Sequence, residues 1–171
     1  MADECIFDFK LDTNHLIRSF DTDDHIGSVL RSAFLVEECV NYCLAKNFED
    51  TSKIVKFGLA QKIHLLQAVG LPSDYIGGLN KIKDIRNKIA HEGLEEIPEK
   101  ELGDLFSVVK NCTQGRFSCE IAVRFDNSTE IYKDMAANKQ LSVLAAVVIS
   151  YLSACVTGKK RCWISDLTPS L

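Results

Sequence analysis

Proline and glycine are scarce in this chain. Its 171 residues include three prolines and nine glycines, which is too few for the many tight turns of a β-sandwich or a β-barrel. A positive net charge is also missing, because 20 lysines and arginines face 24 aspartates and glutamates and the net charge is −4. Duplex DNA requires clustered cations, so the composition argues against a protein coated in duplex DNA. The 46% share of hydrophobic residues excludes a disordered chain and predicts one folded domain over residues 1–171.

The seven cysteines form no zinc-binding pattern. No Cys-x-x-Cys pair occurs, whereas a structural zinc site needs four ligands. Cys39 and Cys43 stand four residues apart on a predicted helix, and we interpret them as core thiols. The first ten residues lack the basic region and apolar run of a signal peptide. The sequence therefore predicts a cytoplasmic protein with reduced, mostly buried cysteines, no metal and no cofactor.

One apolar run, residues 141–156, raises the question of a membrane span. It is shorter than the about 20 residues that cross a bilayer, and it contains three serines. We therefore expect a buried core helix and no membrane partner.

Hydrophobic periodicity predicts an all-α bundle of five to six helices. The expected helices span residues 13–20, 23–46, 52–69, 74–91, 98–114 and 134–156. Alternating apolar residues predict a short strand at 5–11 and a second at 117–125, which leads into a small β-hairpin at about 117–132.

A glutamate interrupts the apolar stripe of the helix at 23–46. The stripe consists of Ile26, Leu30, Ala33, Val40 and Leu44. Glu37 falls on the same face, where a carboxylate needs a cationic partner. We predict that Glu37 is mostly buried and pairs with Arg86.

The helix at 74–91 ends in the residues best suited to catalysis, IRNKIAHEG at 85–93. Arg86 lies near the edge of the apolar face of this helix, and Asn87 and His91 share the adjoining flank at a spacing of four residues. Nearby is a cationic strip, which we define as Lys81, Lys83 and Lys88.

This set of side chains suits attack of a ribose 2′-hydroxyl on the adjacent phosphodiester. Histidine can transfer protons near neutral pH, and arginine can hold phosphate oxygens in a bidentate manner. Asn87 would orient the substrate or the imidazole, and the lysine strip would contact RNA. A purely structural interpretation also stands, in which Arg86 and Glu37 form a buried ion pair and Asn87 and His91 satisfy carbonyls at the helix end.

The string R-N-x-x-A-H at 86–91, closing an amphipathic helix after LAQKIHLLQAVGLP at 59–72, resembles the signature of the HEPN superfamily. Within that group the chain is most similar to the mannitol operon repressor-like proteins. The resemblance covers residues 20–111 and the last helix. It implies a helical bundle that dimerises with its motif helices meeting across the interface.

The resemblance also implies metal-independent endoribonuclease activity at the dimer cleft, with Arg86, His91 and Asn87 as catalytic residues. A second interpretation is a non-catalytic transcriptional or protein-interaction regulator of the mannitol operon repressor type, and a third is a structural dimerisation module. The expected partners are a second copy of the chain, RNA, and a protein partner or antitoxin. The acidic composition and the absence of a helix-turn-helix with a basic recognition helix argue against direct operator binding.

Overall fold

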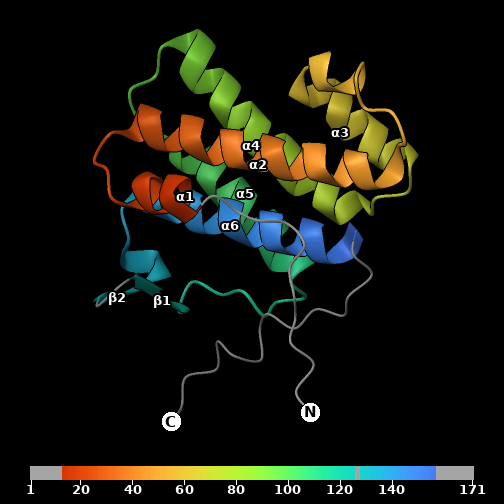
Figure 1. The fold of residues 1–171 in the computed structure, drawn as a ribbon. Coiled ribbons are helices and arrows are strands. Elements are labelled where there is room, and N and C mark those ends of the chain that lie inside the picture. Colours follow the sequence, from red (N-terminus) through yellow and green to blue (C-terminus); the bar gives the residue numbers. More distant parts are fainter. Residues whose placement is uncertain (1–12, 126–127, 157–171) are drawn as a thin grey trace.

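The structure is a computed structural model, which describes residues 13–125 and 128–156. Within these residues the chain forms six α-helices and one two-stranded antiparallel hairpin, which confirms the predicted all-α bundle with its small β-hairpin (Figure 1). The predicted strand at 5–11 lies outside the described residues. The helices are α1 (Thr13–Phe20), α2 (His25–Asn47), α3 (Leu59–Ala68), α4 (Ser73–Glu92), α5 (Glu99–Cys112) and α6 (Ala137–Val156). The strands are β1 (Ala122–Phe125) and β2 (Ser128–Ile131), and two 3₁₀ turns lie at Ile54–Lys56 and Tyr132–Asp134.

Helices α2 and α6 pack against each other and form the centre of the bundle (Figure 1). Helix α6 also contacts α1, α4 and α5. Leu35 and Val36 of α2 and Leu144 and Leu152 of α6 are completely buried. Helix α6 is long and apolar enough to cross a membrane, but 61% of its most apolar stretch is buried inside the bundle. This burial supports the interpretation of 141–156 as part of a core helix.

The face of α2 that enters the core differs from the predicted stripe. Ala33, Val40 and Leu44 are buried as predicted, whereas Ile26 and Leu30 are 42% and 44% exposed. Helices α1 and α6 cover the neighbouring face of α2, and Ile26 and Leu30 remain in contact with solvent. A sequence stripe shows which side chains are apolar, but the neighbouring helices decide which of them are covered.

Glycines mark the ends of two helices, and a third glycine shortens a predicted helix. Gly70 follows α3 with φ = 93°, and Gly93 follows α4 with φ = 65°. Both lie in the left-handed region, where a Cβ atom is unfavourable. The helix predicted at 52–69 begins only at Leu59, because Gly58 is extended (φ −68°, ψ 157°) and its N–H is bonded to the Gln61 side chain.

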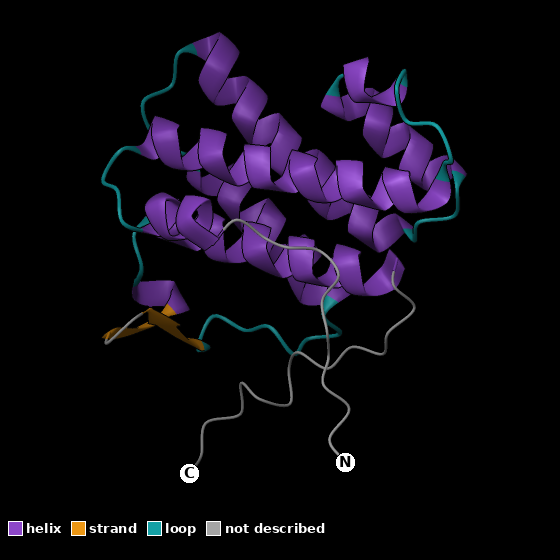
Figure 2. Ribbon diagram, in the orientation of Figure 1, coloured by secondary structure: helices purple, strands orange, loops and turns teal. Residues whose placement is uncertain are grey.

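The hairpin lies at the edge of the bundle, apart from the α4 end of the molecule (Figure 2). Its register pairs Ala122 with Ile131 and Phe125 with Ser128. The alternation that begins at Phe117 predicts a longer strand than the structure contains. Phe117 packs instead in an aromatic cluster with Phe106 and Tyr132, with ring centroids 5.2 to 5.8 Å apart. This cluster attaches the hairpin to α5.

Candidate functional site at the end of helix α4

Helix α4 carries the predicted motif to a solvent-exposed end of the molecule. Its first half packs into the bundle through buried residues such as Leu79 and Ile82. Its last turns extend to the upper edge of the molecule in Figure 1, where Gly93 ends the helix. Ile85 and Ile89 remain buried there, so the end of the helix is held in place. The neighbouring side chains of the motif are therefore presented to solvent from a fixed backbone.

Arg86 is exposed, and its predicted ion pair with Glu37 is wrong. The guanidinium Nη1 donates a hydrogen bond to Oδ1 of Asn87 at 3.0 Å. Arg86 stands two helical turns after buried Leu79 and only about 20° away from it around the helix axis. Neighbouring elements cover only part of the circumference of α4 at this end, since Ile85 and Ile89 are buried while Arg86 is exposed. A helical wheel cannot show where this cover stops.

Glu37 forms its ion pair with Lys62 of α3 instead. Lys62 Nζ lies 2.6 Å from Glu37 Oε1, and the two side chains are 3% and 39% exposed, respectively. Glu37 is thus half-buried rather than mostly buried. The predicted need for a cationic partner is met, but the partner comes from the helix that follows α2 along the chain.

Asn87 and His91 lie on one flank of the helix. Asn87 is half-buried and His91 is exposed. No hydrogen bond of the His91 imidazole is found within the described part of the chain. Arg86 and His91 are five residues apart, so their side chains leave the helix about 140° apart. One copy of α4 therefore brings Arg86 and Asn87 into contact but leaves His91 on another side of the same helix end.

The lysines of the cationic strip are all bound to carboxylates or amides of the same molecule. Lys81 Nζ lies 2.7 Å from Asp104 Oδ2 of α5, and Lys88 forms an ion pair with Glu101 of α5. Lys83 contacts Asp84 at 3.1 Å and Asn80 at 3.2 Å (all three on α4). Lys81 and Lys88 thus connect α4 to α5, whereas Lys83 is bound within α4.

These ion pairs shift the pKa values of their members. The hydrogen bond to Asp104 raises the pKa of Lys81, and the bond to Glu101 raises the pKa of Lys88. The same bonds lower the pKa of Asp104 and the pKa of Glu101. All four groups are therefore charged at neutral pH, and their charges largely cancel at the α4–α5 contact.

Metal chemistry finds no support in the part of the chain that the structure describes. Its residues include no group of three or more histidine, cysteine, aspartate or glutamate side chains that could hold a metal ion. Cys39 and Cys43 are buried, as predicted for core thiols. Cys112 is half-buried, and Cys119 and Cys155 are exposed, so the prediction of mostly buried cysteines is wrong for these three.

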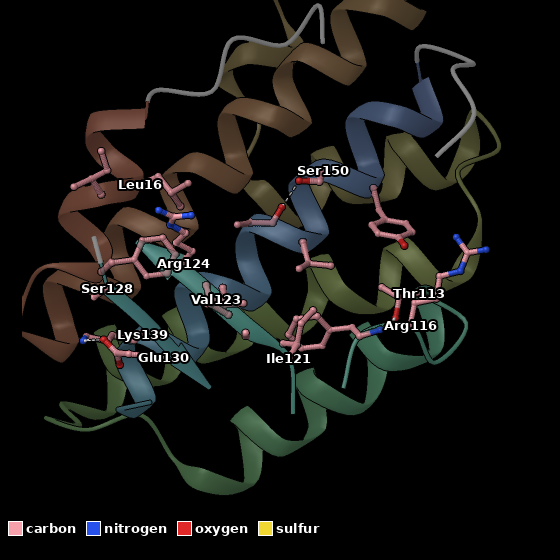
Figure 3. Close-up of a pocket in the computed structure, with 18 of the residues that line it drawn as sticks. Leu16, Thr113, Arg116, Ile121, Val123, Arg124, Ser128, Glu130, Lys139 and Ser150 are labelled. Carbon is pink, nitrogen blue, oxygen red and sulfur yellow. Dashed lines mark hydrogen bonds and ion pairs between the residues drawn. The ribbon is translucent and has the colours of Figure 1, made fainter. Parts of the chain in front are cut away.

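A groove of about 830 Å³ lies between α1, α6 and the hairpin, and it was not predicted from the sequence (Figure 3). None of the motif residues lines it. The alternating apolar residues at 117–125 were its one signal in the sequence, because they supply one wall. The packing of the hairpin against α1 and α6 could not be inferred from local patterns.

Comparisons of the chain with protein-family models, with curated proteins and with solved structures found no match.

Proposed function

We propose that the protein is a HEPN-type, RNA-directed, metal-independent endoribonuclease that acts through Arg86, Asn87 and His91. One observation carries the proposal: Arg86 is exposed beside Asn87 and is not held in a buried ion pair with Glu37. Its guanidinium keeps donors that can bind phosphate oxygens. The exposure of Arg86 contradicts the structural interpretation, in which Arg86 is one half of a buried ion pair.

The proposed reaction needs a cation and a proton transfer. The ribose 2′-oxygen attacks the adjacent phosphorus, the bond between phosphorus and the 5′-oxygen breaks, and a 2′,3′-cyclic phosphate forms. Arg86 stabilises the additional charge on the phosphoryl oxygens. His91 in its protonated form donates a proton to the leaving 5′-oxygen, and a second, neutral histidine accepts the proton of the 2′-hydroxyl.

The second histidine is supplied by a second copy of the chain. Arg86 and His91 diverge on one helix, whereas two α4 ends related by a two-fold axis place two arginines and two histidines around one cleft. Helix α2, which packs against α4, offers apolar surface for such a contact. Its side chains Ile26, Leu30 and Phe34 are 42%, 44% and 49% exposed at a spacing of four residues.

The decisive experiment is cleavage of a labelled single-stranded RNA in the presence of EDTA. We expect cleavage by the wild-type protein, with 2′,3′-cyclic phosphate and 5′-hydroxyl ends, and at least a hundredfold loss in His91→Ala and in Arg86→Ala. His64→Ala is the matched control, because His64 is also exposed but lies on α3. Equal activity of His91→Ala and His64→Ala would show that the activity arises elsewhere.

The dimer is tested separately. We expect a dimer at micromolar concentration in sedimentation velocity, and recovery of part of the activity when Arg86→Ala and His91→Ala chains are mixed. A monomer, or a mixture as inactive as its components, contradicts the composite cleft.

The second candidate function is a non-catalytic regulator that binds a protein partner. The ion pairs of Lys81 and Lys88 favour it, because they reduce the local attraction for RNA. RNA that remains intact at low ionic strength over a range of protein concentrations would contradict the endoribonuclease and favour this alternative.

A further inference from the structure

The groove beside the hairpin has the size of a small-molecule site. Its volume of about 830 Å³ lies within the range of about 300–1,000 Å³ that is usual for ligand pockets. Figure 3 shows it bounded by α1, by the hairpin and by α6. Among the described residues the groove is partly open rather than enclosed.

The walls of the groove are mainly apolar. Leu16 and Phe20 come from α1, Val123 from β1, and Val143 and Val147 from α6. These side chains come from three elements that are far apart in the sequence. An aliphatic chain that replaces water between them is stabilised by the burial of its apolar surface.

Charged groups stand along the rim, and two arginines are left without a carboxylate. Glu130 is bound to Lys139, with 2.7 Å between Oε1 and Nζ. Neither Arg116 nor Arg124 forms an ion pair with any residue that the structure describes, Asp21 of the same rim included. Figure 3 shows Arg124 reaching from β1 toward Leu16 on α1, and Arg116 at the opposite end of the groove.

We propose that the groove binds an amphipathic carboxylate, with its aliphatic chain against α1 and α6 and its carboxylate on Arg124. The guanidinium of arginine matches the two oxygens of a carboxylate in a bidentate arrangement. An apolar pocket with one cation at its edge therefore selects a chain with an anionic end over a neutral chain of equal length. Arg116 stands at the opposite end of the groove (Figure 3), and we assign the carboxylate to Arg124 alone.

This site is separate from the motif at the end of α4. The hairpin and the projecting end of α4 lie at opposite edges of the molecule in Figure 1, and no residue of the motif lines the groove. The inference stands on its own and does not depend on cleavage of RNA.

Binding of decanoate to the full-length protein, measured by isothermal titration calorimetry, tests the proposal. We expect saturable binding of decanoate and at least threefold weaker binding of 1-decanol, which has the same chain without the charge. Arg124→Met should weaken decanoate about fivefold, as expected of an exposed charge pair, and leave 1-decanol unchanged. Arg18→Met is the matched control, because Arg18 is an exposed arginine of α1 that does not line the groove.

A second variant tests the location of the aliphatic chain. Ala146 of α6 lines the groove and is half-buried, so Ala146→Phe should fill part of it and weaken both ligands about tenfold or more. Circular dichroism and thermal unfolding check that the variants are folded, and Arg124→Met, at an exposed position, remains informative if Ala146→Phe is not. No binding of decanoate at millimolar concentration overturns the proposal. Equal binding of decanoate and 1-decanol, or equal effects of Arg124→Met and Arg18→Met, overturns it as well.

Discussion

Removing Glu37 and removing Lys62 from their ion pair should destabilise the fold by different amounts. The Lys62 side chain is 3% exposed and that of Glu37 is 39% exposed. Breaking a buried pair by removing one partner costs about 3–5 kcal/mol, whereas an exposed pair contributes about 0–1 kcal/mol. Glu37→Met leaves the buried ammonium without its carboxylate, so we expect a loss of about 2–3 kcal/mol. Lys62→Met removes the buried charge and leaves a carboxylate that water can reach, so we expect a loss below about 1 kcal/mol.

Urea unfolding followed by circular dichroism measures these losses. For a chain of this size, the loss in Glu37→Met corresponds to a decrease in Tm of about 4–12 °C. In the Lys62→Met background, Glu37→Met should cost almost nothing, because the buried ammonium that it would leave unpaired is absent. Glu38→Met serves as the control, since Glu38 forms no ion pair within the described residues. Equal losses in the two single variants would falsify the reasoning.

Three further predictions concern pH, backbone conformation and thiol reactivity. Ionised Glu101 and Asp104 stabilise the fold because their pKa values lie below their ordinary values of 4.5 and 3.8; urea unfolding should therefore show this stabilisation intact above pH 5 and lost as the pH falls through the lowered pKa values, and Glu101→Gln should reduce the dependence. Gly93→Ala should cost about 1 kcal/mol in thermal unfolding, because Gly93 has φ = 65° and nothing lies within 4 Å of an added Cβ; a loss as small as in a substitution on the exposed face of α4 would contradict the strain argument. Cys119 should react with iodoacetamide in the folded protein, whereas Cys39 should react only on unfolding, because the hydrogen bond with its neighbouring thiol and burial raise the pKa of Cys39; mass spectrometry of the modified peptides distinguishes the two.

Helix positions could be predicted from the sequence because local signals determine them. Apolar periodicity located α2, α4, α5 and α6, and Gly93 marked the end of α4. The partners of charged residues could not be predicted in the same way. Arg86 is exposed although Ile85 and Ile89 on either side of it are buried, and which part of the helix surface is covered depends on how the helices are placed in three dimensions. Lys62 stands among apolar residues of α3, and only the packing of α3 on α2 shows that it reaches Glu37.

The position of the candidate site could be predicted, but its electrostatics could not. Arg86, Asn87 and His91 all stand at the end of one helix, and Asn87 and His91 share a flank because they are four residues apart. The carboxylates that bind Lys81 and Lys88 lie on α5, and Lys88 and Glu101 are 13 residues apart in the sequence. A count of charges on α4 alone therefore overstated its positive potential.

An anion can bind Lys81 or Lys88 only by competing with the ion pairs between α4 and α5. A phosphate that captured Lys81 or Lys88 would leave Asp104 or Glu101 without its cation, so its binding would loosen the contact between the two helices. By thermodynamic reciprocity, any change that stabilises the contact between α4 and α5 weakens phosphate binding by the same free energy. A polyanion held only by Arg86 and His91 would release few counterions, and its affinity would depend weakly on salt. The dependence of the affinity on ionic strength thus reports whether the ion pairs between α4 and α5 remain intact while the polyanion is bound.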